Sequence, residues 1–472
     1  MAGISYDGQS FIVDGRRIWL ISGSFHYAQT SPDHWAELLD AAAGVGFNCI
    51  ETAVPWHLHE PQPGTFRFEE ELDLHRFIEQ VAEAGLRCIL RPGPYIGGGL
   101  DSGGIPAWLL REETKLRQAS PKYIQAAARW IDAVMKQIKG LQITEPTGGP
   151  IVLVQIEHEW FCQNEEQAEG YLSQVARFAH ESGCAVPLIH RNNLWQPIEG
   201  VIEAWSGAEN LFAHSRQLRA VQNDAPGLVM GVPGAVLRVW GETEPDPISG
   251  SALLRNLAKV TAAGAMFNLE PLVGGTHFGF QSGRLADGQS RYVCTEPYGD
   301  APLKPHQTDS PACRACRKLC VFLNQFEALV THLRPDEHHA AAAGPLTVVQ
   351  QSGSQGRLVM LWSDADSAVD DPVQITTADG QELPVYLGRD RVAWLVESAN
   401  LDGAGTLDLT NLRPWAFLDK HLLVLFGPAG TDALISLDGR PIQSSVPEGA
   451  QPHVIAGEKY SVVILNEDQV EA

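Results

Sequence analysis

Two glutamates at the end of an apolar run are the residues best suited to chemistry in this chain. Glu157 and Glu159 follow the apolar residues 151–156 and flank His158, and Trp160 comes directly afterwards. A carboxyl group can donate or accept a proton, and an aromatic ring offers an apolar face on which a sugar can stack. Because side chains alternate along a strand, we expect Glu157 and Glu159 to share one side and His158 to face the other. The alternative interpretation is a pair of solvated acids at a strand end.

The elements that would place these acids at one end of a barrel are visible along residues 1–335. The apolar, strand-like runs are 18–22, 49–54, 87–90, 151–156, 186–190 and 228–232, and the helix-like stretches include 32–44, 74–84, 121–138 and 166–182. This alternation predicts parallel strands joined by crossover helices. The number of repeats favours an α/β fold with a (β/α)8 TIM-type barrel, in which the carboxyl ends of the strands carry the chemistry.

A β-rich region follows the predicted barrel. The run HHAAAAG at residues 338–344 interrupts the pattern, and we expect a linker over residues 336–344. After it, short β-like runs are separated by turn dipeptides such as Asp438–Gly439. We therefore expect the barrel to occupy residues 1–335 and a smaller all-β, sandwich-like domain to occupy residues 345–472.

Composition and charge exclude several classes of partner. The 472 residues include 57 acidic and 34 basic side chains, and the formal charge of −23 repels phosphate backbones and anionic lipid head groups. We therefore expect no nucleic acid and no membrane as partner, and no stretch of the sequence approaches the roughly 20 apolar residues that span a bilayer. The first residues lack a signal-peptide pattern, so we expect a cytoplasmic protein or one whose signal has been removed. The sequence leaves a homo-oligomer open.

Six segments together resemble the glycoside hydrolase family 35 β-galactosidases. They are SGSFHY (22–27), VPWHLHEPQPGTF (54–66), LRPGPYIGGGLDSGGIPAWLL (90–110), GGPIVLVQIEHEW (148–160), GGTHFGF (274–280) and DAPL (300–303). They occur in the order of the family and near its spacing, and they span the whole predicted barrel. The resemblance implies a β-linked carbohydrate substrate and a mechanism that uses two carboxyl groups.

The resemblance also implies roles for individual residues. Glu159 matches the second Glu of the family pattern Ile-Glu-Asn-Glu-Tyr, which is the general acid/base, and the family Asn and Tyr are replaced here by His158 and Trp160. The side chains expected to bind substrate at the barrel mouth are Tyr27, Trp56, Tyr95, His158 and Trp160. The alternative for the aromatic residues is ordinary packing inside the barrel wall.

The nucleophile of the family has no counterpart at its usual position. Aligned without gaps, the family pattern falls on residues 231–241 and puts Gly231 at the nucleophile. A sugar-binding Glu of the family is also lost, because residues 97–99 are three glycines. On the eighth strand, Glu270 stands where the family has a Tyr, and we expect Glu270 to act as a relocated second carboxylate. The alternative is a coincidental acid in a decayed site.

Metal and cofactor sites are not expected. The three cysteines within residues 313–320 fall on one helix face, a spacing typical of a buried stripe, and the sparse cysteines indicate reduced thiols. His26, His57 and His59 lie near the predicted barrel rim, but the family histidines there are structural. We therefore expect neither a metal nor another cofactor.

Three hypotheses for function remain at this point. The first is an enzyme that hydrolyses, or transfers from, a β-linked glycoside, with Glu159 as acid/base and Glu270 opposite it. The second is a non-catalytic sugar-binding pseudoenzyme on the same fold, and the third is an engineered variant without a nucleophile. A Glu270 carboxylate that faces Glu159 favours catalysis, whereas one turned into the barrel wall favours binding alone. The sequence does not specify the sugar or the stereochemical outcome.

Overall fold

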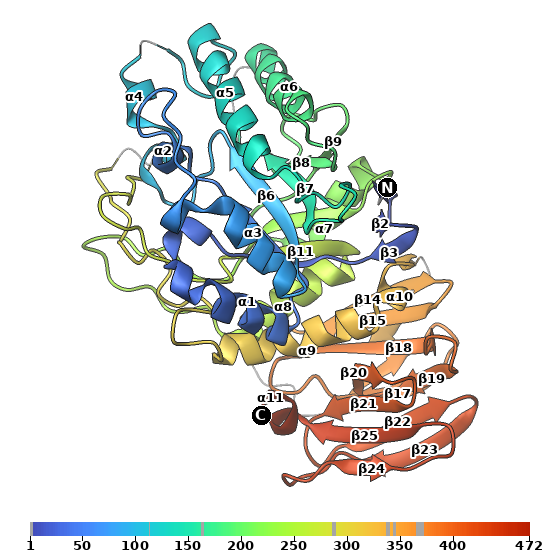
Figure 1. Ribbon diagram of the computed structural model, residues 1–472. Helices are drawn as coiled ribbons and strands as arrows, with labels where there is room; N and C mark the ends of the chain where they lie inside the picture. Colours follow the sequence, from blue (N-terminus) through green and yellow to red (C-terminus); the bar gives the residue numbers. More distant parts are fainter. Residues whose placement is uncertain are drawn as a thin grey trace.

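An eight-stranded parallel barrel is the centre of this computed structural model (Figure 1). The structure describes residues 3–112, 114–161, 165–285, 289–336, 340–342, 346–364 and 372–472. Around the sheet, the strands follow the order β10 (Gly227–Pro233), β11 (Ala265–Glu270), β4 (Ile21–Ser24), β5 (Cys49–Ala53), β6 (Arg87–Gly93), β7 (Ile151–Ile156), β8 (Leu188–His190) and β9 (Val201–Glu203). Trp205, just after β9, pairs with Val229 of β10 and closes the ring. The predicted barrel class is therefore confirmed.

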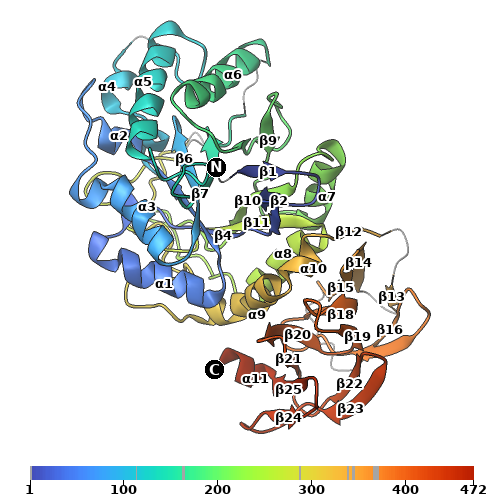
Figure 2. The ribbon, with the colours of Figure 1, turned by 45° about the vertical axis from the view of Figure 1, so that its right-hand side comes forward.

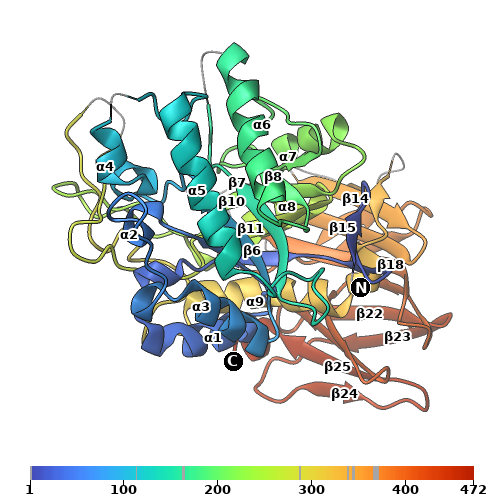
Figure 3. The same ribbon diagram turned by 45° about the horizontal axis from the view of Figure 1, so that its top comes forward.

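The barrel strands are apolar because both of their faces are covered. All residues of β5 and β7 are buried, and the helices lie on the outer side of the ring (Figures 1 and 3). Buried charged residues interrupt the barrel strands, among them Glu51 in β5 and Arg91 in β6. A buried charge requires a partner, so these two residues point to a polar site inside the barrel.

Helices of ten or more residues surround the barrel in the described part of the chain. They are α1 (Trp35–Val45), α3 (Leu74–Glu83), α5 (Pro121–Gln137), α6 (Glu165–Glu181), α7 (Leu211–Val221), α8 (Gly250–Ala262) and α9 (Pro311–Gln325). Residues 191–200, all of them described, connect β8 to β9 without a helix. Within the described part of the chain, no helix combines the length and the apolar composition that a bilayer crossing requires.

Short antiparallel strands make up most of the remaining chain. A meander of β1 (Ile4–Tyr6), β2 (Phe11–Val13) and β3 (Arg16–Ile18) precedes the barrel. After the barrel and α10 (Glu327–Val330), one antiparallel sheet has the order β12 (Arg334–Pro335), β14 (Thr347–Gly353), β15 (Gly356–Trp362), β18 (Val392–Asn400), β19 (Thr406–Thr410), β22 (Asp432–Leu437) and β23 (Arg440–Ser445). A second sheet has the order β20 (Arg413–Leu418), β21 (Leu422–Gly427), β25 (Ser461–Asn466) and β24 (His453–Ile455). The chain ends in α11 (Glu467–Glu471).

The predicted linker over residues 336–344 falls largely outside the described residues, because 337–339 and 343–345 are not among them. Between these gaps, β13 (Ala341–Ala342) pairs with β16 (Val373–Thr376), and β16 pairs with β17 (Glu382–Val385). The division of the chain at residues 335 and 345 stays a prediction.

A buried lysine joins the barrel to the β-rich region. Lys318 on α9 has no exposed side-chain surface, and its ammonium group donates to Asp390 at 2.6 Å and to Glu471 of α11 at 2.5 Å. Asp390 also accepts a hydrogen bond from Ser251 of α8 at 2.6 Å. Figure 2 shows α9 between the barrel and the C-terminal strands. These bonds therefore fix the two regions to each other through paired charges.

The cysteines of α9 line its buried face, as their spacing predicted. Cys313, Cys316 and Cys320 are buried, and the seven described cysteines are all free thiols. Burial raises the pKa of the Cys316 thiol well above its usual value. A neutral thiol is a poor metal ligand and a poor nucleophile, so this stripe is part of the core.

Removing the buried lysine should destabilise the protein strongly. We expect Lys318→Met to lower the free energy of unfolding by about 3–5 kcal/mol, because two carboxylates lose their buried partner. Lys136→Met is the matched control: Lys136 pairs with Asp132 at 2.6 Å but is mostly exposed, and its loss should cost less than about 1 kcal/mol. Urea unfolding of both variants measures the difference, and equal effects would contradict this account of the interface.

Candidate active site

Polar side chains, most of them charged, meet at one end of the barrel from five of its strands. We call them the charged centre: Glu51 in β5, Arg91 in β6, His158 and Glu159 after β7, Arg191 after β8, and Glu270 at the end of β11. Most of these residues are buried, whereas the side chains of Glu270 and Glu159 keep 16% and 38% of their surface exposed. The two predicted catalytic acids, Glu159 and Glu270, thus have the most solvent-exposed side chains of this set.

Arg91 is the inner connection of the charged centre. Its Nε lies 2.9 Å from Oε1 of Glu51, and its Nη2 donates to Oε1 of Glu270 at 3.0 Å. Its Nη1 contacts Nδ1 of His158, and Nη2 lies 3.3 Å from Nε2 of His26. Because a guanidinium can only donate, Nδ1 of His158 accepts and the neutral ring carries its hydrogen on Nε2. Burial, and then the charges of Arg191 and Arg91, hold the pKa of His158 well below its usual value.

Arg191 lies between the two candidate carboxylates. Its Nη2 donates to Oε1 of Glu159 at 3.0 Å, and its Nη1 contacts Oε2 of Glu270. Oε1 of Glu159 also accepts a hydrogen bond of 2.5 Å from Ser206. Glu159 and Glu270 are therefore brought to one place, since they bind the same guanidinium group.

The two arginines keep Glu270 ionised. Burial alone would raise the pKa of Glu270, but the positive charges of Arg191 and Arg91 outweigh it and lower this pKa to about 2. At neutral pH Glu270 is therefore a carboxylate, which is the form that a nucleophile or a general base requires.

Two glycines leave the space that the charged centre fills. A Cβ at Gly231, the residue that the resemblance aligns with the family nucleophile, would lie 2.8 Å from Oγ of Ser206 and 3.3 Å from Nη2 of Arg191. Gly97 has a φ of +68°, and its Cβ would lie 2.7 Å from the ring of His158. The space that the glycines at residues 97 and 231 leave is thus occupied by His158, Ser206 and Arg191.

The predicted alternation around His158 is wrong. Strand β7 ends at Ile156, and both glutamates that follow adopt left-handed backbone angles, with φ of +54° at Glu157 and +44° at Glu159. Non-glycine residues adopt such angles at a cost of about 1–3 kcal/mol, and they do so where surrounding contacts enforce them. Here the buried Glu157 carboxylate accepts from Arg117 at 2.8 Å and contacts the Tyr171 hydroxyl. Glu157 consequently faces the wall, whereas His158 and Glu159 face Arg191.

Three of the five predicted substrate-binding residues lie in the core. Tyr27 is fully buried and its hydroxyl contacts His59, and Trp56 is fully buried and stacks on Trp130 at 5.8 Å between ring centroids. Trp160 is also buried, and its indole N–H donates to the carbonyl of Arg117 at 2.9 Å. In this structure none of the three offers an open ring face, which matches the packing alternative.

Tyr95 and His158 are the predicted substrate-binding residues that adjoin the charged centre. The Tyr95 ring lies 6.3 Å from the His158 ring, and the guanidinium carbon of Arg117 lies 3.8 Å from the Tyr95 ring centroid. Tyr95 therefore contacts the charged centre through His158.

Sequence reasoning missed Arg91, Arg191 and Ser206. A signal was present for the first two, since Arg91 stands inside the apolar strand β6 and Arg191 directly follows the buried strand β8. A charged residue within or just after a buried strand of a barrel indicates a partner of opposite charge nearby. Ser206 carried no comparable signal.

Among the described residues, ligand atoms suited to a metal occur together on Glu51 and Glu270 of the charged centre and on the adjacent His26, within 4.8 Å of one another. Arg91 contacts all three of these residues, so its guanidinium already supplies the positive charge between them. The arrangement therefore fits an arginine better than a metal ion. His59 is engaged elsewhere, with Tyr27 and with the carbonyl of Arg67 at 2.6 Å.

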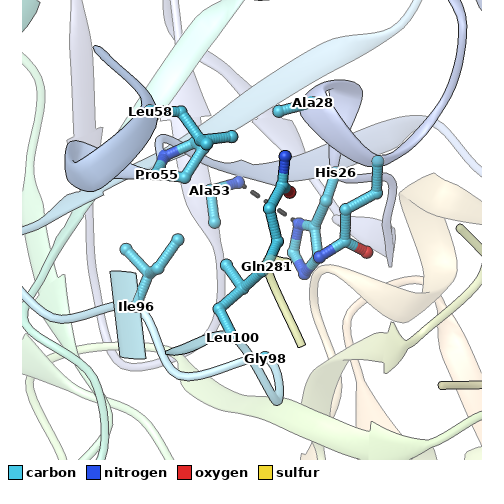
Figure 4. A pocket seen from close by; sticks show the side chains of 10 residues that line it. His26, Ala28, Ala53, Pro55, Leu58, Ile96, Gly98, Leu100 and Gln281 are labelled. Atoms are coloured by element: carbon cyan, nitrogen blue, oxygen red, sulfur yellow. Dashed lines mark hydrogen bonds between the residues drawn. The ribbon is translucent and has the colours of Figure 1, made fainter. Parts of the chain in front are cut away.

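A small apolar pocket lies beside the charged centre (Figure 4). It is lined by His26, Ala28, Gln29, Ala53, Pro55, Leu58, Ile96, Gly98, Leu100 and Gln281. The His26 ring accepts a hydrogen bond from the Ala53 N–H at 3.3 Å, and its other nitrogen contacts Arg91. One imidazole therefore separates the apolar pocket from the charges.

Comparisons with known proteins concern the family and the fold of the chain. The chain matches the model of glycosyl hydrolases family 35 over residues 10–320. The human beta-galactosidase-1-like protein 2 is 32% identical over 290 residues, which are 60% of this chain and 45% of that protein. Human beta-galactosidase is 32% identical over 293 residues, which are 60% of this chain and 43% of that protein. The chain thus spans less than half the length of these relatives.

A solved structure agrees on the fold. A family 5 glycoside hydrolase from Bacteroides vulgatus has a TM-score of 0.55 and 11% sequence identity, covering 84% of this chain and 92% of that one. At this identity the likeness concerns the fold alone.

The depressed pKa of Glu270 should appear as pH-dependent stability. Its contribution is fully present above the unfolded-state value of about 4.3 and is lost as the pH falls through the folded-state value of about 2. We expect the melting temperature of Glu270→Gln to lie below that of the unmodified protein by a constant amount from pH 8 to pH 5.5. Below about pH 4.5 this gap should shrink.

Thermal unfolding of both proteins between pH 3 and pH 8 measures the gap. Glu83→Gln, at an exposed position of α3, is the control and should show no such change. A Glu270→Gln gap that stays constant down to pH 3 would contradict the assignment.

Proposed function

Because the chain belongs to glycosyl hydrolases family 35, we propose that it hydrolyses, or transfers a sugar from, a β-linked glycoside of the β-galactoside type. In this proposal Glu159 is the general acid/base and Glu270 is the second carboxylate. The observation that carries it is that both acids bind the guanidinium of Arg191, so both face the same point at the carboxyl ends of the strands.

Glu270 supplies the negative charge that the reaction needs. The transition state of glycoside cleavage resembles an oxocarbenium ion, which a carboxylate on the face opposite the acid stabilises by attack or by activating water. Glu270 is ionised and positioned from two sides, because Arg91 binds Oε1 and Arg191 contacts Oε2. A sugar carbon that approaches Oε2 has to displace Arg191 from that oxygen.

Glu159 has one oxygen available for the proton. Its Oε1 is occupied by Ser206 and Arg191, whereas its Oε2 lies 3.9 Å from Nε2 of His158, beyond hydrogen-bond length. A proton on Oε2 can therefore be donated to the leaving oxygen without breaking the bond to Ser206. The 38% exposure of this side chain allows the glycosidic oxygen to approach it.

A specific observation favours the second candidate, a sugar-binding protein without turnover. Ser206 and Arg191 fill the space next to Gly231, so neither a carboxylate nor a sugar fits there unless Arg191 moves. In that case the charged centre would bind sugar hydroxyls and break no bond. The paired changes at residues 97 and 231 favour a remodelled site over a single engineered knockout.

Substitution of the acid should affect substrates unequally. We expect Glu159→Gln to lower kcat/KM by about 10²- to 10⁴-fold on a β-linked disaccharide, whose leaving group needs a proton. The loss should be smaller on a nitrophenyl β-galactoside, because nitrophenolate leaves without one. Glu145→Gln, in the loop between α5 and β7, is the control. Steady-state assays of both substrates test the role, and undiminished hydrolysis of the disaccharide would rule it out.

Substitution of the second carboxylate should abolish turnover of both substrates. We expect Glu270→Gln to be inactive, since the transition state then lacks a carboxylate on the face opposite Glu159. Gly231→Glu should not increase activity, because its side chain would meet Ser206 and Arg191. Turnover that survives Glu270→Gln, or that appears only in Gly231→Glu, would eliminate the relocated carboxylate. Saturable binding without turnover by the unmodified chain would establish the second candidate.

A further inference from the structure

A two-stranded ribbon of loop residues stands at the barrel mouth. It pairs the segment after β10 with the segment that follows residue 290: Val239 bridges Val293 antiparallel, and the Trp240 N–H donates to the Tyr292 carbonyl at 2.8 Å. Trp240 is therefore opposite Tyr292, and both side chains point to the face that the two valines do not occupy. Figures 1 and 3 show the loops of this part of the chain next to α2 (Trp56–His59) and α4 (Ala107–Leu110).

The two faces of this ribbon differ in burial. Val293 is fully buried, and a Cβ at Gly99 would lie 3.2 Å from it, so the inner face closes on the loop that follows β6. On the outer face, Trp240 is 64% exposed and Tyr292 is 51% exposed. Single exposed aromatic residues are ordinary, but two large rings side by side on one face of a hydrogen-bonded pair of loop segments indicate a binding surface.

Ion pairs lie on either side of the rings. Arg238 pairs with Glu244 at 2.6 Å and with Glu296 at 2.9 Å, and Arg291 pairs with Glu242 at 2.9 Å. The rings are thus surrounded by side chains that donate and accept hydrogen bonds. A sugar chain matches this mixture, since each sugar ring has an apolar face and a rim of hydroxyl groups. The core of a protein–protein interface, by contrast, is depleted of charged residues.

The first strand of the ribbon begins beside the charged centre. The Gly234 N–H donates to the backbone carbonyl of Glu270 at 3.0 Å, and Trp240 follows six residues later. Six residues span at most about 20 Å, so the outer face lies within about this distance of Glu270. A single sugar fills only the centre, and further sugars of a chain are needed to reach Trp240 and Tyr292.

We propose that Trp240 and Tyr292 form a platform that binds the leaving-group side of a β-linked oligosaccharide or polysaccharide. The inference rests on the proposed function and specifies its substrate class: a sugar chain of more than two residues. The platform sets which substrates are held, and the chemistry stays with the charged centre.

The test compares substrates of two lengths. Galactose release from a β-1,4-linked galactobiose and galactotetraose is assayed with the unmodified protein, Trp240→Ala/Tyr292→Ala, Tyr292→Phe and the control Val454→Ala, which trims an exposed residue of β24. We expect the double variant to lose about tenfold per ring in kcat/KM on the tetrasaccharide and less than twofold on the disaccharide. Tyr292→Phe, which keeps the ring, and Val454→Ala should match the unmodified protein. Equal effects on both lengths, or no effect, would overturn the proposal.

A binding measurement separates this inference from the proposed activity. If the unmodified protein turns over neither substrate, the proposed function fails, and electrophoresis in a native gel that contains β-1,4-galactan then tests the platform alone. Retardation that the double variant loses supports the platform, and retardation that it keeps, or none at all, overturns it. Equal melting temperatures of the variants show that they are folded.

Discussion

Two buried guanidinium groups, each shared by two carboxylates, are the interaction on which the rest of the site depends. Arg91 joins Glu51 to Glu270, and Arg191 joins Glu270 to Glu159. Charges removed from water are tolerated when opposite charges and hydrogen bonds replace the lost hydration. These residues form a row of alternating charges: Glu51, Arg91, Glu270, Arg191 and Glu159. The row fixes the relative positions of side chains from strands that are far apart in sequence. Each member is held because its neighbours would otherwise be left unpaired.

The departures from the family pattern are consistent with this row. Gly231 has no side chain at the place where Ser206 and Arg191 lie, and Gly97 has none at the place where the His158 ring lies. His158, held by Arg91 on one nitrogen, presents its other nitrogen toward Arg191 and Glu159. The substitutions are thus coupled through contacts, and changing one of them alone would create a clash or an unpaired group.

The sequence predicted the barrel well because parallel strands that are buried on both faces appear as continuous apolar runs. Strand β9 is too short, at three residues, to give such a pattern. The resemblance predicts roles for Glu159 and Glu270. Their proximity in space depends on Arg191, which begins a connecting stretch that has no helical or strand pattern. The turn at Glu157 and Glu159 was not predictable, because left-handed angles at glutamate depend on Arg117 and Tyr171 from other segments. Tyr27 and Trp56 have the same residue types whether they stack on a sugar or pack in the core, so only the fold distinguishes these cases.

The net charge of this row changes during the proposed reaction. Burial lowers the pKa of both His26 and His158, so these two rings stay neutral. While Glu159 holds the proton that its proposed role as general acid requires, the carboxylates of Glu51 and Glu270 are matched by the guanidinium groups of Arg91 and Arg191. When that proton passes to the leaving oxygen, one negative charge is left uncompensated at the end of the barrel. A neutral sugar does not balance this charge, but a sugar ring that acquires positive charge does, so the site becomes electrostatically complementary to the charge that develops while the glycosidic bond is breaking.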